Sequence, residues 1–167
     1  MNSIFTRRSV RTYKDKPVEK GKIEKLLKAA MQAPSAWNQQ GWEFIVVENK
    51  DTLEKLSKTS QYAGMTANCA VAIVILANGS SMKVPEYWQQ DLGAATQNLL
   101  IEATELDLGA VWLGVAPEKE RVDYVKDLFN LSDNIVPYAI ISVGYPEGAG
   151  NRFVDRYDAS KVHYEKY

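Results

Sequence analysis

The longest helical pattern in the chain is PEYWQQDLGAATQNLLIEATELD, residues 85–107. Its apolar residues recur at intervals of three and four, which is the period of one helix face: Trp88, Leu92, Ala95, Leu99, Ala103 and Leu106. Ala94, Leu100 and Ile101 widen this surface past a single face. A helix that is apolar on most sides is buried, either by the rest of its own chain or by a partner subunit.

On either side of this segment, the hydrophobic pattern alternates between helices and strands. Helices are expected over 19–33, ended by Pro34, and over 52–58 and 117–129. Strands are expected at 43–48, 71–76, 111–115 and 138–143. The run at 71–76 is continuously apolar, which predicts a central strand with both faces covered. Gly109, after the long helix, is expected to be a left-handed cap.

These elements predict an α+β or α/β domain with a mixed sheet. With 167 residues and no linker, repeat or low-complexity tract, the chain is expected to be one domain, 1–167. The last 20 residues are polar, basic and aromatic without a clear period. They hold more large apolar side chains than a free end would, so we expect this tail to dock, with another subunit as one candidate surface: Phe153, Tyr157, Val162, Tyr164 and Tyr167.

Composition excludes several classes of protein. A single cysteine, Cys69, rules out an internal disulfide, and a single histidine, His163, makes a Cys/His zinc site impossible, so no metal is expected. A net charge of −1 argues against a nucleic-acid-binding protein. No stretch approaches the roughly 18 apolar residues of a membrane helix. A cytoplasmic protein is therefore expected, although the first 14 residues loosely resemble a transit peptide in composition.

Several familiar catalytic motifs are absent from the sequence. There is no GxGxxG dinucleotide fingerprint, no GxxxxGK[ST] loop and no GxSxG elbow. His163 is expected to be a surface or packing residue, and Cys69, at the start of an apolar strand, to be an inert core thiol.

Two segments carry possible binding chemistry. The run Arg7-Arg8-Ser9-Val10-Arg11 offers three guanidiniums and a hydroxyl that could surround a phosphate, although a solvated basic terminus or a nucleic-acid arm would have the same composition. The run APSAWNQQGW, residues 33–42, holds three side-chain amides, which can pair with the ring carbonyls and ring N–H groups of a heterocycle. An ordinary amide-rich turn would look similar.

Taken together, these segments resemble the nitroreductase family of FMN-dependent flavoproteins. The similarity extends over nearly the whole chain, in order. It rests on RRSVRTYKDKPV near the start, APSAWNQQGWEFIVV, the helix segment DLGAATQNLL with the following GAVWLG, then Gly144-Tyr145-Pro146 and 156–164.

The resemblance implies an α+β fold, with a central mixed or antiparallel sheet flanked by helices. It implies an intertwined homodimer with two FMN sites in its interface. It implies phosphate and ring-edge contacts from Arg7, Arg8, Ser9 and Arg11, and ring contacts from Pro34, Ser35, Ala36 and Asn38 of the other subunit. Leu113 and Gly114 would pass along the isoalloxazine, and Arg156, with Arg152 as a further candidate, would return to the phosphate. A lid is expected around 61–68 or 78–86. No side chain is expected to act as a catalytic acid or base, since the cofactor carries the redox chemistry.

The implied activity is an FMN-dependent oxidoreductase that uses NADH or NADPH in a ping-pong hydride-transfer cycle. Its small-molecule acceptor would be a nitroaromatic, a quinone or a similar conjugated compound. The alternatives are a flavin reductase or dehalogenase with another acceptor, a flavin-binding protein without efficient turnover, and a dimeric interaction module without flavin.

Overall fold

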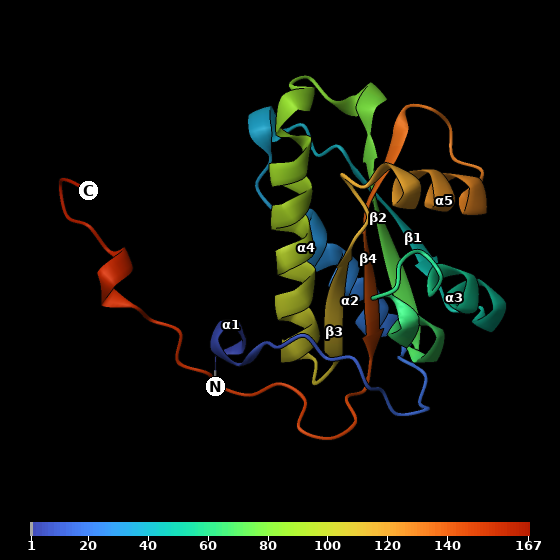
Figure 1. Cartoon of the computed structure of the whole chain (residues 1–167), viewed down its shortest axis with the longest axis horizontal. Coiled ribbons are helices and arrows are strands. Elements are labelled where there is room, and N and C mark those ends of the chain that lie inside the picture. The colour runs from blue at the N-terminus through green and yellow to red at the C-terminus, as the bar shows by residue number, and fades with distance from the viewer. Residues whose placement is uncertain (1) are drawn as a thin grey trace.

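The computed structural model describes residues 2–167 and is built on one four-stranded antiparallel sheet (Figure 1). Its strands are β1 (Trp42–Val47), β2 (Val71–Asn78), β3 (Gly109–Gly114) and β4 (Ile135–Gly144), in the spatial order β1-β2-β4-β3. Strand β3 is therefore an edge strand. The expected α+β class is confirmed, and every strand pair is antiparallel.

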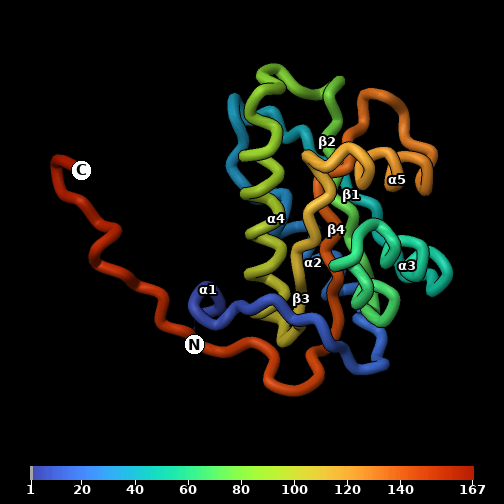
Figure 2. The backbone as a smooth tube through the Cα atoms, viewed as in Figure 1, coloured from blue at the N-terminus to red at the C-terminus, as the bar shows by residue number. Residues whose placement is uncertain are grey.

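Helices cover both faces of the sheet (Figures 1 and 2). The helices α2 (Lys20–Met31) and α4 (Trp88–Glu105) pack together on one face, over Val71, Ile73 and Ile75. The helices α3 (Lys50–Leu56) and α5 (Lys119–Phe129) cover the other face, over Ala72, Val74 and Leu76. Every residue of 71–77 is buried, so the expected central strand is confirmed.

The long helix is buried mostly by its own chain. Leu92, Ala95, Leu99 and Ala103 are fully buried in the α2–α4 core, while Ile101 stays partly exposed. The helix therefore needs a partner subunit for only a small part of its apolar surface.

Three expected helix boundaries differ from the structure. Helix α3 begins at Lys50, because the Asn49 side chain accepts a hydrogen bond from Thr52 N at 3.0 Å. Helix α5 begins at Lys119, so Pro117 precedes it. The expected left-handed cap at Gly109 is wrong: Asp107 adopts that conformation, with φ 60°, and Gly109 is the first residue of β3.

The C-terminal tail, residues 152–167, extends away from the body and is exposed along its whole length (Figure 1). Tyr157 is 76% exposed and Tyr164 is 83% exposed. The tail carries the short 3-10 helix η5 (Ala159–Lys161) and begins with a hydrogen bond from Arg152 N to Thr6 O at 2.8 Å. The start of the tail, up to Tyr157, lines a hollow with Phe5, Arg7 and Arg8, and docking of the tail on a second copy stays a prediction.

Candidate functional site

The N-terminal segment runs beside the outer edge of β3. Ser9 forms a parallel bridge with Ala110, and Val10 N donates to Ala110 O at 3.0 Å. The buried Tyr13 holds the end of this segment, because its hydroxyl lies 2.7 Å from Val10 O and 3.1 Å from Ser142 O. The arginines before and after Ser9 are thereby fixed against the end of the sheet.

Four guanidinium groups gather around a cavity of about 390 Å³ at this end of the molecule. Arg8 and Arg11 come from the N-terminal segment and Arg152 and Arg156 from the start of the tail, with Ser9 between them and Glu147 as the one lining carboxylate. Arg7 lies next to this cavity, where it lines a neighbouring hollow together with Arg8 and Arg156. The structure thus brings together both predicted groups of arginines, including Arg152.

The charges of this cluster are not neutralised by the protein. None of the ion pairs within residues 2–167 involves these arginines. Desolvation and the positive charges of Arg156, Arg7 and Arg152 lower the pKa of Arg8 below its usual value. The Nε of Arg8 is buried and has no hydrogen-bond partner. The two Nη atoms of Arg8 donate to the carbonyls of Arg7 and Phe5, which orient its guanidinium. A cavity of guanidiniums without acid partners, one of them with an unsatisfied buried N–H, fits an anion such as a phosphate.

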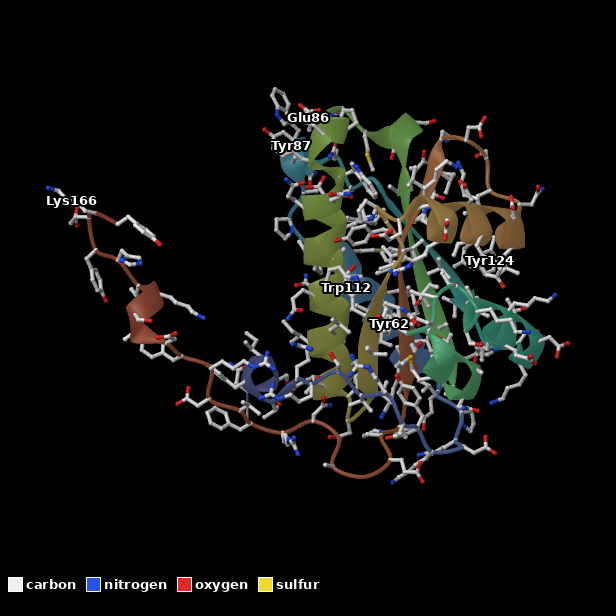
Figure 3. All side chains as sticks on the ribbon, in the orientation of Figure 1. Tyr62, Glu86, Tyr87, Trp112, Tyr124 and Lys166 are labelled. Atoms are coloured by element: carbon white, nitrogen blue, oxygen red, sulfur yellow. The ribbon has the colours of Figure 1, made fainter. Side chains whose placement is uncertain are left out.

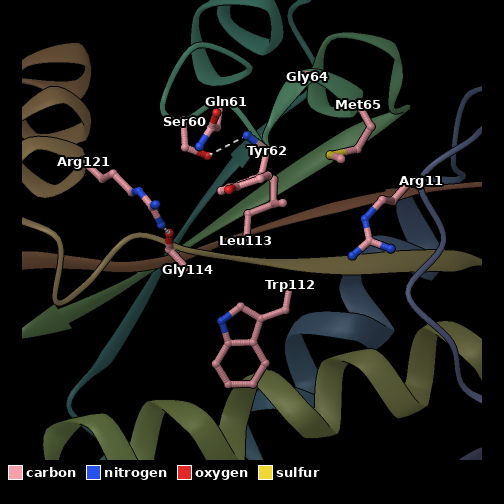
Figure 4. A pocket seen from close by; sticks show the side chains of 10 residues that line it. All are labelled: Arg11, Ser60, Gln61, Tyr62, Gly64, Met65, Trp112, Leu113, Gly114 and Arg121. Carbon is pink, nitrogen blue, oxygen red and sulfur yellow. Dashed lines mark hydrogen bonds between the residues drawn. The ribbon is translucent and has the colours of Figure 1, made fainter.

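A second cavity, of about 500 Å³, lies along β3 (Figure 4). Leu113 and Gly114 line it, and the segment 60–65 forms one wall, while the Trp112 side chain extends to the opposite side of β3 from Leu113 (Figure 4). Tyr62 lies over Leu113, and Arg121 and Arg11 stand at opposite ends (Figure 4). Arg11 lines this groove as well as the arginine cavity, so the two adjoin at that residue.

Of the two expected lid segments, only the first lies at this groove. Gln61 and Met65 line it, the latter from the 3-10 helix η2 (Gly64–Asn68). The segment 78–86 lies elsewhere: Figure 3 shows Glu86 at the N-terminal end of α4, away from Tyr62 and Trp112.

The amide-rich loop, residues 33–42, also lies at the N-terminal end of α4. Ala36 N donates to Asp91 Oδ1 at 2.9 Å, and Gln39 Nε2 donates to Asp91 Oδ2 at 2.6 Å. Asp91 and Gln39 are buried, whereas Pro34 and Asn38 are exposed and Ser35 and Ala36 partly exposed. The buried anchor of the loop is thus Gln39, a residue that the sequence analysis did not select.

The loop backbone is strained in a way that supports a binding role. Trp37, Asn38 and Gln40 adopt left-handed conformations, with φ of 53°, 50° and 48°. Such conformations cost roughly 1–3 kcal/mol each in a residue other than glycine and cluster at functional sites. Trp37 lies within the 3-10 helix η1 (Ala36–Asn38) and is 78% exposed.

The predicted site residues therefore form two groups at opposite ends of α4. The loop residues contact Asp91, while at the other end of α4 Glu105 accepts a hydrogen bond from Ser3 of helix α1 (Ser3–Thr6), just before the arginines. Fourteen helical residues separate Asp91 from Glu105, which is about 21 Å at 1.5 Å per residue. One chain thus brings together the arginines, Leu113 and Gly114, but not Pro34, Ser35, Ala36 and Asn38.

The single cysteine and the single histidine of the chain lie outside these cavities. Cys69 is fully buried, as expected, and desolvation raises the pKa of its thiol to about 11, while its inertness stays a prediction. His163 is exposed on the tail, as expected. Among residues 2–167, no helix combines the length and the apolar character needed to cross a membrane.

Comparison with known proteins identifies the family. The model of the nitroreductase family matches residues 4–62 and 59–145. The chain belongs to the nitroreductase family. Its members are oxidoreductases, and the resemblance seen in the sequence is confirmed.

Individual relatives of this nitroreductase-family chain match over its full length. A Methanothermobacter thermautotrophicus protein, named as an NADH dehydrogenase/NAD(P)H nitroreductase, is 41% identical over 168 residues, covering 100% of this chain and 87% of the relative. The solved structure of a Clostridium acetobutylicum protein named as an NADH oxidase has a TM-score of 0.98 at 57% identity and covers 99% of both chains. An FMN-dependent nitroreductase from Clostridium difficile has a TM-score of 0.92 at 32% identity, with 99% of both chains covered.

Proposed function

We propose that this chain is an FMN-dependent oxidoreductase that uses NAD(P)H to reduce nitroaromatic, quinone or similar conjugated acceptors. The main observation behind this proposal is that Arg11 lines both the arginine cavity and the groove along β3. A ligand with a phosphate at one end and a flat ring system at the other fits these adjoining cavities. FMN has that shape, and the name of the Clostridium difficile structure supports the same cofactor.

The residues present fit FMN. Arg7, Arg8, Arg152 and Arg156 would hold its phosphate, which would also satisfy the buried Nε of Arg8. Ser9 would add a hydroxyl contact beside them. Arg11, at the junction of the two cavities, would meet the edge of the ring, where its positive charge favours added electron density.

The groove would take the ring system of the cofactor. Leu113 and Gly114 lie on an edge strand, so their backbone is accessible from the groove. The apolar side chains of Leu113 and Met65 would exclude water from one side of the ring. When bound, FMN supplies hydride transfer, accepting from NAD(P)H and delivering to a second substrate in the same place, which gives ping-pong kinetics. No side-chain acid or base is assigned a catalytic role.

A homodimer completes the proposed site. Within one chain neither the arginine cavity nor the groove is lined by Pro34, Ser35, Ala36 or Asn38, so we infer that these residues meet the ring of the second copy. The exposed aromatic side chains of the tail would find a surface on that copy. A dependence on NAD(P)H agrees with the cytoplasmic location expected from the sequence.

The first experiment is a visible spectrum of the purified protein with added FMN, followed by anaerobic reduction with NADH and with NADPH. Bound flavin bands that bleach with either donor are expected. A protein that takes up no FMN would overturn the cofactor assignment. Bound FMN that neither donor reduces would identify a flavin-binding protein without turnover.

The shared site has its own test in mixed dimers. The Arg8→Ala variant impairs the arginine end, and Asp91→Ala releases the loop. Co-expressed with different tags, the two variants should form a mixed dimer with one intact site, because one chain keeps its arginines and the other keeps its loop. About one FMN per mixed dimer is expected. If the mixed dimer binds no more FMN than the two parent variants do, each site is built from a single chain.

A further inference from the structure

The groove along β3 contains a cation that the proposed cofactor site does not use. Arg121 lies in the first turn of α5, and its Nη1 donates to Gly114 O at 3.0 Å, so its guanidinium is fixed at the end of the groove farther from Arg11 (Figure 4). The sequence analysis did not select Arg121, because a single arginine on an exposed helix has no distinguishing pattern.

The charged residues that line the groove are all positive. Arg11 and Arg121 are its charged residues, and no carboxylate lines it. The rest of the lining includes the aromatic side chain of Tyr62 and the apolar Leu113. A surface that combines an aromatic side chain with guanidinium groups suits a flat aromatic ring that carries a negative charge.

The acids near Arg121 do not neutralise it. Asp123 is paired with Lys119, one turn along the same helix. Glu118 lies three residues before Arg121, but their link is the backbone bond from Arg121 N to Glu118 O at 3.0 Å. Within residues 2–167, none of the ion pairs involves Arg121, and its one side-chain hydrogen bond is to a carbonyl. A guanidinium has five N–H donors, so most of them remain for a ligand.

We propose that Arg121 is a specificity-determining residue that makes the site prefer acceptors carrying a carboxylate or a similar anionic group on their aromatic ring. The proposal rests on the proposed function, because it places the acceptor in the same groove as the cofactor ring. Arg11 is assigned to the cofactor, so Arg121 is the cation left for the acceptor. The bond to Gly114 O orients the guanidinium, and the anion would accept from its remaining N–H groups.

The test compares two probes of nearly equal shape, 4-nitrobenzoate and the uncharged 4-nitrobenzamide. Their dissociation constants are measured by perturbation of the flavin spectrum in the FMN-loaded protein and by quenching of tryptophan fluorescence in the protein without FMN. The variants are Arg121→Gln, which removes the charge but keeps N–H donors, and Arg121→Lys, which keeps the charge. Lys126→Gln is the matched control, since it removes a positive charge from the same helix outside the groove and leaves the Lys119–Asp123 pair intact.

The wild-type protein should bind the benzoate more tightly than the amide. In Arg121→Gln this preference should fall about tenfold, with binding of the amide changed less than twofold. Arg121→Lys should keep most of the preference, and Lys126→Gln should keep all of it. An unchanged preference in Arg121→Gln would overturn the proposal. So would an equal loss for both probes, or a loss of FMN affinity without a change in preference, which would assign Arg121 to the cofactor.

Failure of the proposed function has a different signature. In one outcome the protein takes up no FMN, but tryptophan fluorescence shows a preference for the benzoate that depends on Arg121. The oxidoreductase proposal would then be wrong and the anion site would stand. In the other outcome the protein binds FMN and is reduced by NAD(P)H, but its preference for the benzoate does not depend on Arg121. The proposed function would then stand and this inference would be wrong.

Discussion

The side chain of Val10 fills the space that a side chain on Gly109 would need. A Cβ at Gly109 would lie 2.6 Å from Val10 Cγ1, 2.7 Å from its Cβ and 2.9 Å from its Cγ2. Distances under 3.0 Å to a branched side chain so near its own backbone require the backbone to move. Gly109 therefore allows the N-terminal segment, with its arginines, to lie directly on the edge of the sheet.

The Gly109→Ala variant should lose FMN affinity without a change to any residue proposed to contact FMN. The added methyl group displaces Val10, and Arg8 and Arg11 move with it. We expect the FMN dissociation constant, measured by fluorescence titration, to rise at least tenfold. Gly21→Ala is the matched control, because a Cβ there meets nothing within 4 Å and alanine favours the helix. Equal FMN affinity in both variants would contradict the proposed role of the segment.

The Arg8→Ala variant should weaken FMN binding more than removal of an exposed charge elsewhere. A charge-assisted hydrogen bond contributes about 1.5–3 kcal/mol, so the dissociation constant should rise by roughly 10- to 150-fold. Arg8→Lys, which keeps the charge, should lose less FMN affinity than Arg8→Ala. Lys28→Ala, which removes a charge from an exposed ion pair with Glu24, should bind FMN as the wild type does. The readout is the FMN titration at fixed ionic strength. If Arg8→Ala binds FMN as the wild type does, the arginine cavity is not the phosphate site.

The Asp91→Ala variant should destabilise the chain and release the amide-rich loop. Its carboxylate accepts from Ala36 N and from the buried Gln39 side chain, so alanine leaves Ala36 N without its acceptor and leaves Gln39 Nε2 with Val84 O alone, at 3.2 Å. A loss of about 1–3 kcal/mol in the free energy of unfolding is expected. Urea denaturation measures this loss, and Asp51→Ala, in the exposed first turn of α3, is the control. Equal stability of the two variants would show that the carboxylate does not hold the loop.

The thiol of Cys69 should resist modification in the native protein. Burial raises its pKa to about 11, so at pH 8 roughly one molecule in a thousand carries the reactive thiolate. Ellman's reagent should therefore react only at the rate at which the chain unfolds, and at once in 6 M guanidinium. Rapid reaction of the folded protein at pH 8 would contradict this burial.

The same shift predicts how stability depends on alkaline pH. The folded state keeps the thiol proton to about pH 11, whereas the unfolded chain loses it near pH 9. The stabilisation is therefore complete below pH 9 and is lost as the pH rises toward 11, by about 2 kcal/mol at pH 10.5. Cys69→Ala should remove this part of the decline between pH 8 and 10.5 in urea denaturation. An identical decline in the variant would assign it to other groups, such as the buried Tyr13, whose pKa is also raised by desolvation.

The fold was largely predictable from local pattern. The continuous apolar run at 71–76 is sufficient to place β2 at the centre of the sheet, because only a strand covered on both faces has no polar side. The start of α3 was missed because Asn49 was not weighed as a cap. Gly109 was misassigned because glycine serves both as a helix cap and as a point of close packing, and only Val10, 99 positions away, distinguishes the two.

The candidate site was predictable in its residue types but not in its arrangement. Arg7 and Arg8 lie far from Arg156 in the sequence, and they meet it only because Ser9 pairs with Ala110 and Arg152 with Thr6. The role of Gln39 depends on Asp91, 52 residues away. Neither relationship leaves a periodic signal in one sequence, and the same is true of Arg121 and Gly114.

The distance between Asp91 and Glu105 constrains the length of α4, independently of which residues the helix contains. Inserting one residue between them would add 1.5 Å and turn one end relative to the other by about 100°, so the loop and the arginines would no longer face compatible directions in a pair of chains. Substitutions on its exposed side should be tolerated, whereas insertions and deletions should not. For this chain, a gap in an alignment over residues 91–105 would be more informative than many mismatches.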